Sequence, residues 1–229
     1  MDQIARVWRH QRSTIHGKQV TIIVGEEERT FTAHEPVLLA SSVYIQRAMS
    51  GRWNESITNT IRLPEIEPDI FAIYLYWRYF GVLPVQNTDP EAEDLELAKS
   101  YVLGDRIMDT SFQNKVIEAF VEKRDELVLF KSRRCFSSVA VKYIYENTLE
   151  SAKVRKLLVD LYVLTCESSW LLSCRHKDHL PHEFLVELSA RLMDRPPRRD
   201  NPGSISAEDY FEGVEGSSAE SALKDCVKW

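Results

Sequence analysis

The sequence predicts an α+β fold in which a small β-sheet comes first and a series of helices follows. Three features carry this prediction. Residues 20–33 hold two stretches suited to strands, separated by a glycine turn. Residues 68–81 form an apolar segment that begins with proline and ends with glycine, as helices often do. Residues 131–194 repeat apolar side chains at the spacing of amphipathic helices.

The first predicted element is a β-hairpin. The stretch "VTIIV" (residues 20–24) is rich in β-branched residues, "GEEE" makes a turn, and "RTFTA" (residues 29–33) alternates as a half-buried strand does. His34 follows and stands before Glu35 and Pro36, and the proline biases Glu35 away from helical geometry. We therefore expect a structural role for His34, whose imidazole would bond nearby backbone and fix the corner between strand and helix.

Two short helices and a third strand are expected next. In "EPVLLASS", Pro36 lies in the first turn of one helix, and Ser41 or Ser42 can cap a second helix that runs to residue 51. The stretch "NTIRL" alternates again through Ile61 and Leu63 and predicts the third strand.

The segment at residues 68–81 is predicted to be a helix with almost no polar face. Such a helix is expected to be covered on most sides by its own domain or by a partner. An aromatic box for a ligand is the alternative, and core packing is the favoured interpretation because aromatic side chains commonly fill small cores. Helices at residues 94–106 and 110–124 follow, again from their apolar spacing.

The two ends of the chain differ from its middle. Residues 1–16 are polar and basic, but Ile4, Val7 and Trp8 recur at helical spacing, so the segment is either a docking helix or a frayed end. Residues 196–229 are rich in Pro, Gly, Ser and charge, and this composition predicts a disordered tail.

Composition narrows the classes of partner. The net charge of −6 and the pI near 5.6 give no basic field for a phosphate backbone, so protein partners are expected rather than direct contact with nucleic acid. The longest apolar run, residues 70–77, is far shorter than the roughly 20 residues of a membrane helix. The N-terminal segment also lacks the apolar core of an export signal. The four cysteines are therefore predicted to be reduced thiols in the cytoplasm or nucleus. They are Cys135, Cys166, Cys174 and Cys226.

Cofactor and metal motifs are weak. The turn "GEEER" lacks the further glycines and the lysine of a phosphate-binding loop. Thiols and imidazoles near residues 166–182 are of the type that zinc prefers, but their spacing does not give two well-formed ligand pairs. We therefore predict no cofactor, no metal site and no enzymatic activity. The residues considered for zinc are Cys166, Cys174, His176, His179 and His182.

Taken in order, these elements resemble the BTB/POZ domain. The matching stretches are "VTIIVGEEERTFTAHEPVLLASSVYIQRAMSGRWNES", "IRLPEIEPDIFAIYLYWRYFG" and "LELAKSYVLGDRIMDTSFQNKVIEAF". The later stretch "VKYIYENTLESAKVRKLLVDLYVL" resembles the helical continuation of fungal BTB proteins. The expected organisation is an N-terminal segment at residues 1–16, a BTB/POZ domain at 17–123, a helical extension at 124–195 and the tail at 196–229.

The resemblance implies a non-enzymatic protein-interaction module. In BTB adaptors of cullin-type ubiquitin ligases, a hydrophobic residue, any residue and then glutamate contribute to the cullin-binding surface. The triplet Trp53-Asn54-Glu55, close to Met49, resembles that pattern. A tryptophan anchor beside a fixed carboxylate also suits an interface physically. A substrate adaptor would in addition need a recruitment surface within residues 131–229.

Self-association is the second implication of the resemblance, because BTB domains often dimerise through an N-terminal helix and the first helices of the core. The alternative function is therefore a homo- or hetero-oligomerising scaffold in nuclear or transcriptional assemblies, without cullin binding. The residues expected at a dimer interface are Ile4, Val7, Trp8, Val37, Leu38 and Tyr44.

Overall fold

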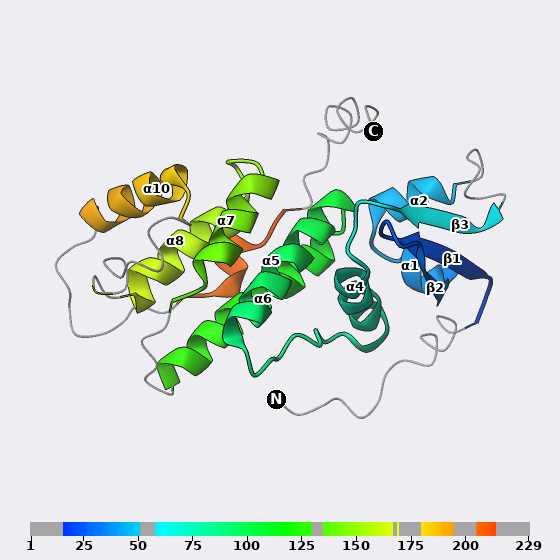
Figure 1. Cartoon of the computed structure of the whole chain (residues 1–229), viewed down its shortest axis with the longest axis horizontal. Helices are drawn as coiled ribbons and strands as arrows, with labels where there is room; N and C mark the ends of the chain where they lie inside the picture. Colours follow the sequence, from blue (N-terminus) through cyan, green and yellow to red (C-terminus); the bar gives the residue numbers. More distant parts are fainter. Residues whose placement is uncertain are drawn as a thin grey trace.

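The computed structural model describes residues 16–50, 58–129, 135–166, 169, 180–194 and 205–213. It has the predicted α+β architecture, with a small sheet and its helices at one end and further helices at the other (Figure 1). No helix of this described part is long and apolar enough to cross a bilayer.

The sheet has three strands in the order β2-β1-β3. The predicted hairpin is confirmed: β1 and β2 are antiparallel, and Gly25 enters the turn with a φ of 76°, a conformation that glycine adopts without strain. β3 pairs parallel to β1, with Ile22 opposite Ile61. Alternate residues of β1 are buried, as the sequence alternation requires. The strands are β1 (Gln19–Val24), β2 (Arg29–His34) and β3 (Thr60–Leu63).

The helix ends follow the local signals in the sequence. Ser42 caps α2, because its Oγ accepts a hydrogen bond from the Ile45 N–H at 3.1 Å. Gly81 ends α4 in the left-handed region, with a φ of 75°. The helices are α1 (Glu35–Leu39), α2 (Val43–Ala48), α4 (Pro68–Phe80), α5 (Pro90–Arg106), α6 (Thr110–Leu129), α7 (Ser138–Asn147), α8 (Lys153–Thr165), α10 (His182–Met193) and the 3-10 helix η2 (Ala207–Tyr210).

The turn between α5 and α6 is tied to α2. Ser42 Oγ donates to the carbonyl of Ile107 at 2.7 Å. The N–H groups that open α2, those of Val43 and Tyr44, donate to carbonyls of the same turn at 3.3 and 3.4 Å. The first turn of α2 is thereby satisfied by main chain more than sixty residues away.

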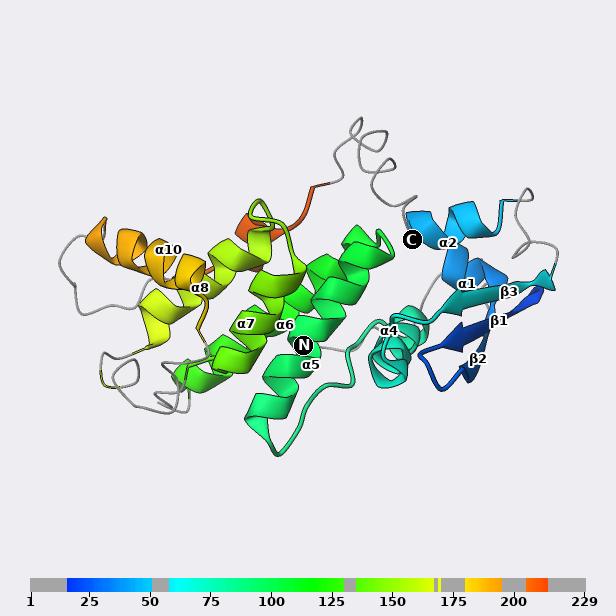
Figure 2. The same cartoon turned by 45° about the horizontal axis from the view of Figure 1, so that its top comes forward.

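The helical extension shares one core with the sheet-containing part. α5 packs against both α6 and α7, and α6 continues without a break through residue 123, where the sequence suggested a boundary (Figure 2). A buried ion pair joins the parts: Lys123 Nζ lies 2.7 Å from Asp94 Oδ1. Asp94 Oδ2 accepts the N–H of Ser137, the residue that caps α7, at 2.9 Å. One carboxylate thus fixes α5, α6 and the start of α7.

The prediction of reduced thiols is wrong for two cysteines. Cys135 and Cys166 form a disulfide, with Cα atoms 5.5 Å apart, a separation that suits such a bond. Sequence spacing did not indicate the pair because 31 residues separate the two. The packing of α7 against α8 brings Cys135, three residues before the start of α7, to Cys166, the residue after α8. Cys174 and Cys226 lie outside the described residues.

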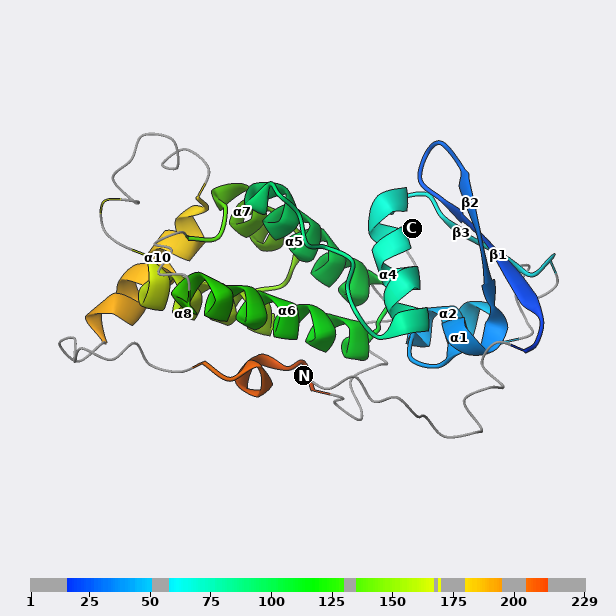
Figure 3. The same cartoon turned by 90° about the horizontal axis from the view of Figure 1, so that it is seen from below.

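The region predicted to be a disordered tail contains a segment with defined structure. Residues 205–213 run along α6 and α8 and include η2 (Figure 3). Tyr210 is buried, while Ile205, Ala207 and Phe211 pack against the core. The low overall hydrophobicity of the region concealed these few anchoring side chains.

Candidate interaction surfaces

His34 has the structural position expected for it, but its partner is different. Its main-chain N–H donates to the hydroxyl of Tyr79 at 3.0 Å, and its Nδ1 lies 2.9 Å from the same oxygen. The hydroxyl thus accepts from the backbone and can donate to the imidazole. The expectation of a bond to nearby backbone was wrong, because a tyrosine on α4, 45 residues later, completes the corner.

A second contact ties the same corner to α4. The guanidinium of Arg78 donates twice to the carbonyl of Val37, from Nε at 2.9 Å and from Nη2 at 2.7 Å. The last turn of α4 therefore holds both the end of β2 and the middle of α1. The start of the α1–α2 region is therefore joined to α4 by hydrogen bonds.

The residues expected at a dimer interface divide into three groups. Val37 and Leu38 are buried in the core of the protomer, 4% and 0% exposed, so they cannot form the exposed part of an interface. Tyr44 is 38% exposed on α2, and its neighbour Val43 is exposed as well. Ile4, Val7 and Trp8 lie outside the described residues.

Of the residues proposed for cullin contact, the structure describes Met49 alone. Met49 is half-buried against the core at the C-terminal end of α2. Trp53, Asn54 and Glu55 lie outside the described residues, which stop at Ser50 and resume at residue 58. The triplet is therefore flanked by α2 on one side and the start of β3 on the other.

An exposed aromatic pair on α4 was not predicted. The rings of Tyr76 and Phe80 lie 4.5 Å apart between centroids, and Phe80 is 65% exposed. Val82 continues the apolar surface and lines a hollow of about 320 Å³ with Leu83 and Val85. The i, i+4 spacing of the two rings was visible in the sequence. Apolar residues all around this helix gave no indication of which face would be exposed.

The part of the chain that contains the sheet and α4 also matches a known protein family. The family model of the BTB/POZ domain matches residues 10–112. Residues 10–112 are a BTB/POZ domain. The match covers the sheet, α1, α2, α4 and α5, and it ends at the beginning of α6. BTB/POZ domains mediate protein binding, often dimerisation, and are typically non-catalytic.

Inside the BTB/POZ domain, the fully buried carboxylate of Asp109 joins several elements. Asp109 caps α6 by accepting the Phe112 N–H at 3.0 Å, and it also bonds the hydroxyls of Tyr74 and Ser41. Burial raises the pKa of the Tyr74 hydroxyl, and the Asp109 carboxylate raises it further. The tyrosine therefore stays protonated and acts as a hydrogen-bond donor in the core.

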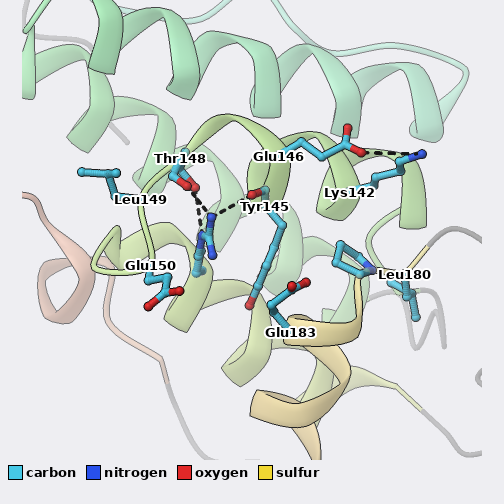
Figure 4. A pocket seen from close by; sticks show the side chains of 10 residues that line it. Lys142, Tyr145, Glu146, Thr148, Leu149, Glu150, Leu180 and Glu183 are labelled. Atoms are coloured by element: carbon cyan, nitrogen blue, oxygen red, sulfur yellow. Dashed lines mark hydrogen bonds and ion pairs between the residues drawn. The ribbon is translucent and has the colours of Figure 1, made fainter. Parts of the chain in front are cut away.

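The largest hollow described lies outside the BTB/POZ domain, between α7, the turn to α8 and the start of α10 (Figure 4). It measures about 580 Å³. Two of its polar lining residues have partners: Arg155 donates to the carbonyls of Tyr145 and Thr148, and the Tyr145 hydroxyl donates to Glu187. Burial raises the pKa of that hydroxyl, and the hydrogen bond to Glu187 adds to the shift. These groups hold helices together.

The residues weighed for zinc do not come together in the described part of the chain, where no three His, Cys, Asp or Glu side chains are grouped to hold a metal. Cys166 is bonded to Cys135, and His182 begins α10. Cys174, His176 and His179 lie outside the described residues.

Proposed function

We propose that the chain is a non-enzymatic adaptor that binds a cullin through the end of α2 and the segment after it, at Met49, Trp53, Asn54 and Glu55. The observation that carries this proposal is the placement of the pattern. It follows directly from α2, whose Val43 and Tyr44 are exposed, and it enters β3 of a BTB/POZ domain. An exposed apolar helix face continued by a tryptophan and a carboxylate supplies both buried area and orientation.

The helical extension supplies the second half of an adaptor in this proposal. Its likeness to the extension of fungal BTB proteins fits a region with its own recruitment role. A cullin partner would locate the chain in the cytoplasm or nucleus, where thiol reductants act on disulfides such as Cys135–Cys166.

The test is calorimetric titration of the full chain with the N-terminal domain of its cognate cullin. Glu55→Lys is expected to weaken binding by at least about tenfold, since reversing a charge at an interface costs on the order of 2 kcal/mol or more. Glu27→Lys is the matched control. Glu27 is exposed in the turn that follows the C-terminal end of β1. Residues 51–57 come before the N-terminal end of β3 in the sequence, and β3 runs parallel to β1, with Thr60 paired to Thr21 near the start of β1. Equal binding by both variants, or none by the folded wild type, would reject the cullin proposal.

A self-associating scaffold is the second candidate, and the exposure of Tyr44 on α2 favours it. Multi-angle light scattering of the full chain is expected to give the mass of a dimer, and Tyr44→Asp is expected to give that of a monomer because a charge would be buried in the interface. A wild-type monomer at micromolar concentration would remove this candidate.

A further inference from the structure

The segment at residues 205–213 is held in the way a bound peptide is held. It follows a ten-residue stretch, residues 195–204, whose composition is rich in Pro and Arg. It runs along α6 (Figure 3) and is hydrogen-bonded to Tyr101 near the end of α5, to Asn114 in the first turns of α6 and to Asp160 in α8. The surface of these three helices that contacts the segment is the groove, and none of the three includes a residue of the segment.

Tyr210 is the side-chain anchor of the segment. It is only 5% exposed, and its hydroxyl donates to Asp160 Oδ2 at 2.8 Å. Lys156 Nζ lies 4.6 Å from the centre of its ring. The other oxygen of Asp160 accepts a hydrogen bond from Arg191 Nε at 2.6 Å, so the carboxylate is also positioned by a residue outside the segment.

Glu212 is the second anchor. Its Oε1 accepts from the hydroxyl of Tyr101 at 2.5 Å and from the main-chain N–H of Lys153 at 2.9 Å. Lys153 is the first residue of α8, so the carboxylate also sits at the positive end of a helix dipole. The groove therefore reads a tyrosine and a glutamate two residues apart.

The main chain of the segment is read as well. Asn114 Nδ2 donates to the carbonyl of Glu212 at 3.3 Å, and Asn114 Oδ1 accepts the N–H of the same residue at 2.8 Å. Lys153 Nζ donates to the carbonyl of Phe211. A side-chain amide that pairs with both polar groups of one residue recognises extended backbone whatever its sequence, a property suited to binding peptides.

The charge on the groove side is mixed. The segment carries Glu208, Asp209 and Glu212 and no basic residue. The groove faces it with Lys153 and Lys156 but also with the carboxylates of Asp160 and Asp105. Burial raises the pKa of Asp105, and the nearby carboxylate of Glu212 raises it further. If the segment leaves, the Tyr101 hydroxyl loses its acceptor Glu212 and keeps its main-chain contact at Val154, while the Asn114 amide loses both of its partners. Another peptide of the same chemistry satisfies them again, whereas an unrelated one does not.

We propose that this groove is a recognition site for a partner protein's acidic peptide containing Tyr-x-Glu, and that residues 205–213 occupy it as a built-in competitor. The tether holds the chain's own segment at an effective concentration in the millimolar range, so a partner must bind more tightly or act when the segment is displaced. The proposal goes beyond the adaptor function and does not require cullin binding.

The test is fluorescence polarisation with a labelled synthetic peptide of residues 203–214. The probe is titrated with the full chain and with the full-length variant Y210A/E212A, in which the competing segment has lost both anchors. The variant is expected to bind the peptide at least about 100-fold more tightly than the wild type, because tethered competition is removed. Adding Asn114→Ala to the variant is expected to abolish this gain, and so is replacing the tyrosine of the peptide with alanine.

A second measurement tests the proposal without substituting the anchors, in case the groove of the Y210A/E212A variant does not keep its shape. A protease site is introduced between residues 196 and 203 of the otherwise native chain and is cut after folding. Labelled peptide is expected to exchange into the cut protein. If neither the folded variant nor the cut protein takes up peptide, residues 205–213 are a permanent part of the fold and the proposal fails. If the wild type is a dimer that exchanges segments between copies, the groove serves self-association and the partner proposal is overturned.

Discussion

At the scale of single residues, the polar groups that matter are those that join distant parts of the chain. The Tyr79 hydroxyl is one of them, because it serves both the backbone N–H and the imidazole of His34. The sequence predicted a structural role for His34 through a bond to nearby backbone. It could not indicate the partner, since nothing local places a residue of the next long helix against the end of a hairpin.

Tyr79→Phe removes that hydroxyl and little else. Urea denaturation is expected to show a free energy of unfolding lower by about 1–3 kcal/mol, because a half-buried N–H loses its acceptor. Tyr76→Phe, on the exposed side of the same helix, serves as the control and should change it by less than about 0.5 kcal/mol. Equal effects of the two substitutions would show that the corner does not depend on this hydroxyl.

Asp160 gives a pH dependence. Burial alone would raise the pKa of this carboxyl, but hydrogen bonds from Arg191 and Tyr210 and the charge of Lys156 lower it below its usual value. A pKa lowered by folding means that the ionised carboxylate stabilises the fold above its unfolded pKa, about 3.9, and that this stabilisation is lost as pH falls through the folded pKa.

The comparison that checks this is Asp160→Asn. At neutral pH the variant is expected to unfold at lower urea concentration than the wild type, and the gap should close as the pH is lowered below about 4, where the wild-type carboxyl becomes protonated. A gap that stays constant down to about pH 2 would mean that the charge of Asp160 contributes nothing to stability.

At the scale of elements, turns and caps were the most predictable features. The glycine turn of the hairpin, Ser42 at the start of α2 and Gly81 at the end of α4 were all read from the sequence and found in place. These signals act within a few residues, so local chemistry determines them. Two features needed tertiary information: the strand order β2-β1-β3, and the choice of Tyr76 and Phe80 as the exposed face of α4.

Gly81→Ala tests the cap of α4. Gly81 has a φ of 75°, and a Cβ placed there meets no atom within 4 Å, so only backbone strain opposes the change. The free energy of unfolding is expected to fall by about 1 kcal/mol. Gly81→Asn should cost less, because asparagine tolerates the left-handed region better. Differential scanning calorimetry of the three proteins ranks them, and an alanine variant as stable as the wild type would contradict the cap.

At the scale of the whole molecule, the BTB/POZ domain and the helical extension pack against each other through α5, α6 and α7. The ion pair of Lys123 and Asp94 lies between them, and α6 belongs to both. The sequence suggested separate regions because their textures differ. Continuity became visible only when α5 was found packed against both α6 and α7.

Lys123→Met is expected to lower the free energy of unfolding of the whole chain by about 3–5 kcal/mol, since it removes the buried cation that lies 2.7 Å from Asp94 Oδ1 and 3.4 Å from Glu93 Oε1. The double variant D94N/K123M should recover part of the loss because position 94 then carries no charge, although Glu93 still lacks Lys123. Both variants should still unfold in a single transition when followed by tryptophan fluorescence and by circular dichroism. Two separated transitions would show that the extension is an independent domain.

The turn between α5 and α6 touches two surfaces at once. Its carbonyls accept the first N–H groups of α2, and the helix that follows it carries Asn114 into the peptide groove. A ligand that shifts this turn at the proposed peptide site would also shift the first turn of α2, because few covalent bonds separate the two. Binding linkage is reciprocal. The factor by which the peptide changes the affinity of a partner for the α2 face then equals the factor by which that partner changes the affinity of the protein for the peptide.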